Sequence, residues 1–317
     1  MKALVTGAAG FIGSSLSDEL LRMGMEVVGL DCFTDYYSKE IKQRNVSEAK
    51  RSKSFVLKHL NLATDEVTDS LRGVKWVFHL AGQAGVRNSW GTEFQNYVDW
   101  NILATQKLLE AAKKNEGIEA FVAASSSSVY GSVKDSVSEQ TLPSPISPYG
   151  VSKLAAEHLC TLYGSQFGLP TVSLRYFTVY GPRQRPDMAM YRIVEAALSG
   201  SIFSVFGDGN QQRDFTYVAD IVDATIKAAQ FASKVSQVGE SFNIAGGTVC
   251  SLNDVISMVE GISKKTVNRV FNNKPAGDPL KTFADTGKAI KLLGWKPNTS
   301  IELGLEKQIQ YQFASHQ

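Results

Sequence analysis

A tyrosine and a lysine four residues apart are the clearest candidates for proton transfer in the sequence. Tyr149 and Lys153 open a segment, residues 147–167, whose pattern predicts a long helix, so both side chains lie on one helical face. A free phenol has a pKa of about 10, which is too high for a base at neutral pH. A neighbouring ammonium favours the phenolate, so we expect Lys153 to lower the pKa of Tyr149 and make it a general base.

Four consecutive serines support this interpretation. Residues 125–128 directly follow an apolar run at 121–124. In a parallel sheet, ligands bind outside the carboxyl ends of the strands. A Tyr-x-x-x-Lys pattern alone is common by chance, but hydroxyl groups at such a strand end are not expected of a loop that only connects elements. The serines, Tyr149 and Lys153 therefore form one candidate catalytic centre.

The start of the chain suits phosphate binding. Residues 7–13, Gly-Ala-Ala-Gly-Phe-Ile-Gly, follow an apolar run at 3–5 and open a helical pattern at 11–23. Glycine permits the tight turn and the close approach of a pyrophosphate, which the amides and dipole of the helix start attract. Asp31 ends the next apolar run, where a carboxylate accepts hydrogen bonds from an adenosine ribose and repels a 2′-phosphate. We expect NAD rather than NADP, and a cationic nicotinamide would further favour the phenolate of Tyr149.

Two more polar residues lie in or shortly after apolar runs. Asn61, followed by Leu62, stands where a carboxylate often binds adenine in such folds, and its amide can still donate and accept hydrogen bonds. We expect this pair to contact the adenine. His79 lies inside an apolar run, and we expect it to pack in the core rather than to react.

The elements that must position these residues form a regular alternation. Continuous apolar runs separated by helical patterns are typical of a parallel sheet covered on both faces, so the prediction is a doubly wound α/β (Rossmann) fold. The alternation loosens after about residue 178. We expect a NAD-binding domain at 1–177, with residues 214–245 crossing back to it, and a smaller C-terminal α/β domain at 178–317. Residues 38–54 are polar and are either disordered or a helix with its loop. The runs lie at 3–5, 26–30, 54–57, 76–80, 121–124 and 172–176.

Composition excludes several classes of protein. The 317 residues are 43% hydrophobic and 20% charged, which is ordinary for a globular protein, and the net charge of +2 gives no basic field for nucleic acid or an anionic membrane. No apolar run approaches the roughly 20 residues that span a bilayer. Three separated cysteines and four scattered histidines suggest neither a disulfide framework nor a metal site. We expect a cytoplasmic enzyme that acts on small molecules.

With these residues assembled, the chain resembles the extended short-chain dehydrogenase/reductase family, the nucleotide-sugar epimerases and dehydratases, over nearly its whole length. The resemblance rests on residues 7–13, 79–82, 207–215 and 293–297, on Asn101, on the serines and on the Tyr149–Lys153 pair. It implies NAD as cofactor, a UDP-sugar as substrate and a homodimer built on helices near 101–113 and 149–167. The implied cofactor contacts are Gly7, Gly10, Phe11, Ile12, Gly13, Asp31, Asn61, Leu62, Leu80, Ala81, Asn101, Tyr149 and Lys153.

Finer features resemble the glucuronate-specific 4-epimerases of this family. These are residues 83–87 and 175–189, including Thr178 where glucose-specific members typically have asparagine. The resemblance implies that Tyr149 removes the proton of the sugar 4-hydroxyl while Ser126 holds that oxygen and C4 passes hydride to NAD. The 4-keto sugar then turns its other face, so UDP-glucuronate and UDP-galacturonate interconvert. Epimerisation of neutral UDP-hexoses, decarboxylation of UDP-glucuronate and a silent NAD-binding regulator are the alternatives.

The substrate residues follow from the same comparison. Ser127 and Ser128 stand where dehydratases and decarboxylases of the family typically have acidic residues, which argues against both reactions. We expect these serines and Thr178 to donate to the substrate carboxylate, while Arg185 supplies charge. The resemblance assigns the UDP diphosphate to Arg213, whose fork of donors suits phosphate. Arg87 is a second candidate for the diphosphate, and Asp278 is a candidate for the nucleotide.

Overall fold

The structure is a computed structural model that describes residues 1–235, 238–273, 277 and 279–315. Its strands are β1 (Lys2–Thr6), β2 (Glu26–Asp31), β3 (Phe55–His59), β4 (Trp76–His79), β5 (Ala120–Ser126), β6 (Thr171–Tyr176), β7 (Thr178–Tyr180), β8 (Phe203–Phe206), β9 (Gln212–Tyr217), β10 (Glu240–Ile244), β11 (Thr248–Ser251) and β12 (Arg269–Asn272). Its helices are α1 (Phe11–Arg22), α2 (Lys39–Asn45), α3 (Phe94–Tyr97), α4 (Ala104–Lys113), α5 (Pro148–Phe167), α6 (Ala189–Ser199), α7 (Val218–Ala232), α8 (Leu252–Ser263) and α9 (Ile301–Ser315).

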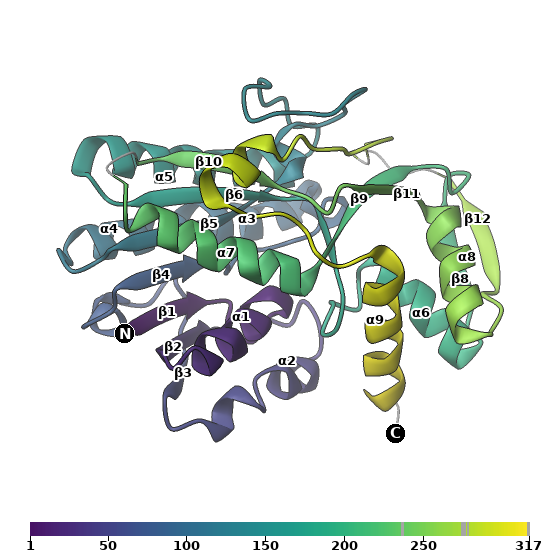
Figure 1. The fold of residues 1–317 in the computed structure, drawn as a ribbon, viewed down its shortest axis with the longest axis horizontal. Coiled ribbons are helices and arrows are strands. Elements are labelled where there is room, and N and C mark those ends of the chain that lie inside the picture. The colour runs from purple at the N-terminus through teal and green to yellow at the C-terminus, as the bar shows by residue number, and fades with distance from the viewer. Residues whose placement is uncertain (236–237, 274–276, 278, 316–317) are drawn as a thin grey trace.

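Seven strands form one sheet in the order β10-β6-β5-β4-β1-β2-β3. All of its neighbouring strands run parallel. Helices α1 and α7 pack on one face and α4 and α5 on the other, as Figure 1 shows. The central strands are largely apolar and buried because both faces of the sheet are covered. The prediction of a doubly wound parallel sheet is confirmed.

A smaller region extends from one side of this sheet (Figure 1). It holds a three-stranded sheet, β11-β9-β7, a two-stranded sheet, β12-β8, and the helices α6, α8 and α9. Between β9 and β11 the chain returns through α7 to β10, which pairs with β6 of the large sheet. The chain therefore passes more than once between the large sheet and the smaller region.

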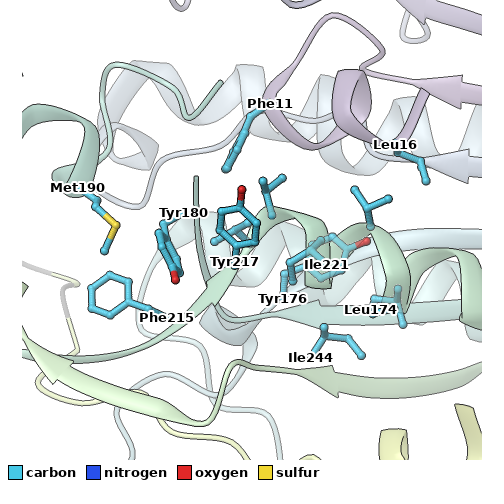
Figure 2. Packing of buried hydrophobic residues seen from close by; sticks show 14 of the residues in the cluster. Phe11, Leu16, Leu174, Tyr176, Tyr180, Met190, Phe215, Tyr217, Ile221 and Ile244 are labelled. Atoms are coloured by element: carbon cyan, nitrogen blue, oxygen red, sulfur yellow. The ribbon is translucent and has the colours of Figure 1, made fainter. Parts of the chain in front are cut away.

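One apolar cluster fixes the smaller region against the sheet. Figure 2 shows Phe11 of α1 near Tyr180 and Tyr217 of the small sheet, with Met190 of α6 beyond them. All four side chains are buried. Because Phe11 opens the helix that follows the glycine turn, this packing also fixes the turn.

The polar stretch 38–54 is ordered. The Ser38 hydroxyl caps α2 by accepting from the amide of Ile41 at 3.4 Å. Asn45, at the end of the helix, is buried and donates to the carbonyl of Ala9 at 3.1 Å. The expectation of a helix with its loop is confirmed, and that of disorder is wrong.

Three features bear on membrane, metal and redox chemistry. None of the helices in the described part of the chain has the length and apolar character to cross a membrane. The same part of the chain contains no cluster of three or more His, Cys, Asp or Glu side chains that could hold a metal ion. Cys32, Cys160 and Cys250 are free thiols.

Candidate active site

A cavity of about 200 Å³ opens at the carboxyl ends of β1, β2 and β4. Most of the predicted cofactor residues line it. They are Gly7, Gly10, Phe11, Ile12, Gly13, Asp31, Asn61, Leu62, Leu80 and Ala81.

The glycine turn suits a pyrophosphate. Gly7 has φ +68°, and a Cβ on it would come within 2.9 Å of the amide nitrogen of Ala81. A Cβ on Gly13 would come within 2.1 Å of the Gly7 carbonyl oxygen. Gly10 is the N-cap of α1 and has no side chain to accept from the first amides of the helix. Those amides therefore face the cavity as donors for an anion.

Asp31 is held rigidly at the end of β2. Its Oδ2 accepts from the amide of Ala9 at 2.9 Å, and its Oδ1 accepts from the amide of Phe33 at 2.8 Å. Each carboxylate oxygen can accept two hydrogen bonds, so ribose hydroxyls can still bind. Together with the glycine turn, this donor and acceptor set fits NAD.

Tyr149 and Ser126 meet across the gap between α5 and β5. The two side chains are hydrogen-bonded, and burial raises the pKa of the Tyr149 phenol against the opposing effects of that bond and of the Arg185 charge. The cation that acts on the phenol is thus Arg185. Lys153 is not among the groups that act on this pKa, so the expectation that it lowers the pKa of Tyr149 is not met. The pKa rises because the cost of burying a phenolate outweighs the effects of Ser126 and Arg185.

Lys153 is half-buried and Asn101 is fully buried. Burial lowers the pKa of Lys153 to about 8, although the nearby Cys160 and Glu157 oppose the shift. Asn101 lies in a π-helical segment, Val98–Leu103, a local distortion that turns it inward. Its Nδ2 donates to the carbonyl of Gln83 at 3.0 Å, and its buried Oδ1 has no partner among the described residues. Asn101 Oδ1 and Lys153 Nζ both lie beside Gly82. A Cβ on Gly82 would be 2.6 Å from the oxygen and 3.9 Å from the nitrogen.

His79 is a packing residue. It is buried, with Nδ1 2.9 Å from the Thr6 hydroxyl and Nε2 2.9 Å from the Thr105 hydroxyl. Burial and the Lys153 charge lower its pKa to about 3, so the ring is neutral at any working pH. The expected core role is confirmed.

A second cavity of about 520 Å³ lies between the sheet and the smaller region. Arg87, Thr178 and Arg213 line it, as does Arg192 of α6. The Arg87 guanidinium stacks 4.3 Å from the centre of the Phe206 ring, which is also in the wall. Three arginines and an aromatic face suit a ligand that carries both phosphate and a flat ring.

Tyr36, Arg185 and Asp187 form the partition between the two cavities. Tyr36 lines both, Arg185 lines the first and Asp187 lines the second. Arg185 Nε and Nη2 donate to the two oxygens of Asp187 at 2.9 and 3.1 Å. The Tyr36 hydroxyl donates to Asp187 Oδ2 at 3.2 Å. Arg185 therefore lies where the cavities meet, with one edge of its guanidinium paired to Asp187.

The remaining predicted residues divide into two groups. Ser127 and Ser128 form a 3-10 turn after Ser126, and neither lies in the described walls of the two cavities. Asp278 lies outside the described residues.

Sequence reasoning missed several wall residues. Tyr36, Tyr37 and Lys42 line the first cavity, and Arg192 and Phe206 line the second. A pair of tyrosines in an otherwise polar loop was an available signal for the first group. Arg192 gave none, because a single arginine in a predicted helix is most often on the surface.

Comparisons with known proteins agree with this geometry. The family model for the NAD dependent epimerase/dehydratase family matches residues 3–245. The uncharacterized UDP-glucose epimerase YtcB of Bacillus subtilis (strain 168) is 46% identical over 98% of both chains. UDP-glucuronate 4-epimerase of Thermodesulfobacterium geofontis (strain OPF15) is 37% identical, over 97% of this chain and 95% of the relative. The crystal structure of UDP-glucuronic acid 4-epimerase from Bacillus cereus, in complex with UDP-glucuronic acid and NAD, superposes with a TM-score of 0.96 at 44% identity, over 99% of this chain and 100% of the other.

The matched residues run from β1 through β10, so the family model covers the whole large sheet, the glycine turn and the Tyr149–Lys153 pair. The chain belongs to the NAD dependent epimerase/dehydratase family.

Proposed function

We propose that the protein interconverts UDP-glucuronate and UDP-galacturonate by epimerisation at C4, through a 4-keto sugar, with bound NAD. One observation carries the proposal: the Tyr149 phenol is hydrogen-bonded to Ser126 and feels the charge of Arg185, a residue of the dinucleotide cavity wall whose partner Asp187 lines the arginine-lined cavity. The Bacillus cereus structure and the Thermodesulfobacterium geofontis relative support the choice of a UDP-uronate.

The roles of the side chains follow from this arrangement. When bound, NAD would take the hydrogen of C4 as hydride and later return it, and its positive ring would favour the phenolate of Tyr149. Tyr149 takes the proton of the 4-hydroxyl and gives it back, and Ser126 holds the oxygen. Lys153 and Asn101 contact the nicotinamide half of the cofactor. Arg87, Arg192 and Arg213 hold the diphosphate, so the keto sugar turns over without leaving.

Acid–base chemistry at C5 has no suitable group in the second cavity. Asp187 is the one carboxylate in its described wall, and it accepts hydrogen bonds from both Arg185 and Tyr36. A carboxylate bound in this way is a weak base, and Ser127 and Ser128 are neutral. These features favour epimerisation over dehydration or decarboxylation.

The direct test uses the purified protein with UDP-glucuronate, UDP-glucose or UDP-N-acetylglucosamine, without added cofactor, and NMR identification of the products. UDP-galacturonate supports the proposal. UDP-galactose alone would support the neutral-hexose alternative, which the name of the Bacillus subtilis relative favours. A UDP-pentose with CO₂ would support decarboxylation.

Arg185 is proposed to recognise the substrate carboxylate, together with Ser127, Ser128 and Thr178. Replacing Arg185 with alanine is expected to raise the KM for UDP-glucuronate about 10- to 150-fold, the equivalent of one charged hydrogen bond of about 1.5–3 kcal/mol. The KM for UDP-glucose should change little, because that sugar has no carboxylate. Steady-state kinetics with both substrates measures the difference.

Arg87→Ala is the matched control, because this arginine lines the second cavity and is proposed to contact the diphosphate that both substrates share. It should weaken both substrates equally. Equal losses for both substrates in Arg185→Ala would remove the carboxylate role and assign Arg185 to the shared part of the ligand.

We further propose that the chain divides into a NAD-binding domain at 1–177, to which residues 214–245 return, and a smaller sugar-nucleotide domain at 178–317. The return of α7 and β10 to the large sheet supports this division. The catalytic cycle then takes place at the boundary between the two domains.

We also propose a homodimer in the cytoplasm. Leu103 beside α4, and Val151, Leu162 and Phe167 of α5, are large apolar side chains with 41–56% exposure, which suits a helical interface. Three free thiols suit a reducing compartment. Light scattering on the purified protein tests the dimer.

A further inference from the structure

A buried ion pair lies beneath the proposed catalytic centre. Glu157 of α5 and Arg175 of β6 are only 6% and 5% exposed. Arg175 Nε donates to the two Glu157 oxygens at 3.2 and 3.1 Å, and Arg175 Nη2 donates to Oε1. Removing two charges from water costs about as much free energy as their attraction returns, so stability alone is a weak reason for such a pair.

The ion pair is hydrogen-bonded to the residues on either side of the serine segment, residues 126–129. Glu157 Oε2 accepts a hydrogen bond from the Ser125 hydroxyl at 2.7 Å. Arg175 Nη1 donates to the Tyr130 hydroxyl at 2.6 Å. Ser125 immediately precedes Ser126, and Tyr130 immediately follows the 3-10 turn Ser127–Val129. The four residues between these anchors include all three serines that the proposed function uses.

The same ion pair also connects that segment to the helix of the general base. Glu157 lies one helical turn beyond Lys153 and two beyond Tyr149 on α5. Further bonds tie the pair to β10: the Ser241 hydroxyl donates to Glu157 Oε1 at 3.1 Å, and the Tyr130 hydroxyl donates to Asn243 Oδ1 at 2.8 Å. Helix, serine segment and sheet are thus joined through one pair of charges.

We propose that Glu157 and Arg175 are positioning residues for proton transfer: through Ser125 and Tyr130 they fix residues 126–129 relative to α5, and so set the hydrogen bond between Ser126 and Tyr149. The proposal rests on the proposed function, since it gives Ser126 and Tyr149 their task. Neither charged residue lines either of the two cavities. A small misplacement of a reacting group can cost roughly 10²-fold in rate, so the position of residues 126–129 relative to Tyr149 affects kcat.

The effect on Tyr149 distinguishes positioning from a purely structural role. The Ser126 hydrogen bond is one of the contacts that lower the pKa of the Tyr149 phenol. If the serine segment loosens, that contact weakens and the pKa of Tyr149 rises. A purely structural role would lower the melting temperature and leave this pKa unchanged.

The test removes single hydroxyls and keeps both charges, because Glu157→Ala leaves an uncompensated buried cation and is a poor probe. Ser125→Ala and Tyr130→Phe are the test variants. Ser70→Ala is the matched control, since it also removes a buried serine hydroxyl, which accepts one hydrogen bond from Lys58 Nζ at 3.2 Å and lies in the wall of neither cavity. All three are compared with wild type as NAD-loaded protein.

In the test variants kcat is expected to fall roughly tenfold while the KM for UDP-glucuronate stays within about twofold. The acidic limb of the kcat–pH profile should move to higher pH. A second readout needs no turnover: in protein labelled with ¹³Cζ-tyrosine, the Tyr149 resonance, assigned with Tyr149→Phe, should titrate at higher pH in Ser125→Ala than in wild type.

The proposal is overturned if both test variants match Ser70→Ala in kcat, in the pH profile and in the tyrosine titration. A wild-type protein that converts no UDP-uronate would refute the proposed function instead. In that case the tyrosine titration still decides whether the ion pair governs the Ser126–Tyr149 contact, because it involves no sugar.

Discussion

Replacing Tyr149 with phenylalanine is expected to reduce kcat roughly 10³-fold, within the usual range for the loss of a general acid–base group. The phenylalanine ring fills nearly the same space, so the edge contact with Tyr97, at 6.1 Å between ring centres, and the fold are retained. Without the hydroxyl, no group takes the proton of the sugar 4-hydroxyl. Product formation by NMR, together with the NAD content of the purified variant, measures the effect.

Tyr163→Phe is the control for this variant, because it removes a phenol from the same helix, where the hydroxyl donates to Glu110 at the far end from the site. It should keep wild-type activity. If Tyr149→Phe retained more than about a tenth of wild-type kcat, the proton would have to leave by another route.

The pH dependence of the wild-type enzyme follows from the same group. Burial raises the pKa of Tyr149, while Ser126 and Arg185 oppose the rise. Since the phenolate is the form that accepts the proton, kcat should fall as pH falls through the pKa of the loaded enzyme. Arg185→Ala removes one opposing charge, so the fall should begin at higher pH in that variant than in wild type.

The fold could be read from the sequence because its signals are local. The runs that became β1, β4 and β5 are mostly apolar, which is typical of strands in a sheet covered on both faces. The glycine turn and Asp31 lie at the carboxyl ends of neighbouring parallel strands, so their neighbourhood followed from topology alone.

The walls of the second cavity could not be predicted from local sequence signals. Its wall brings together Tyr36, Arg87, Arg192 and Phe206 from four separate segments, whose approach depends on how α6 and β8 pack against the sheet. The balance of forces on Tyr149 was also beyond the sequence. Spacing put Lys153 on its helical face, but only packing decides how strongly burial opposes the phenolate and which cation is near.

The glycine turn carries the second large prediction. Gly13→Ala is expected to weaken NAD binding by at least about 100-fold, the equivalent of roughly 2.7 kcal/mol. The added Cβ would lie 2.1 Å from the Gly7 carbonyl oxygen and 2.8 Å from its carbonyl carbon, and both belong to backbone that cannot swing aside. The start of α1 must therefore move away from the turn, and the amides that face the pyrophosphate move with it. The measurement is the amount of NAD that remains with the protein after gel filtration.

Gly261→Ala separates this effect from the general consequence of changing a helical glycine. Gly261 lies within α8, and a Cβ there meets no atom within 4 Å. Alanine should stabilise that helix by about 0.8–1.0 kcal/mol, with NAD content unchanged. Because both variants add one methyl group to a helix, the difference in NAD content between them isolates the contact with Gly7. A Gly13→Ala protein that kept stoichiometric NAD would mean that α1 can shift without disturbing the phosphate site, and the tight turn would then not be what holds the cofactor.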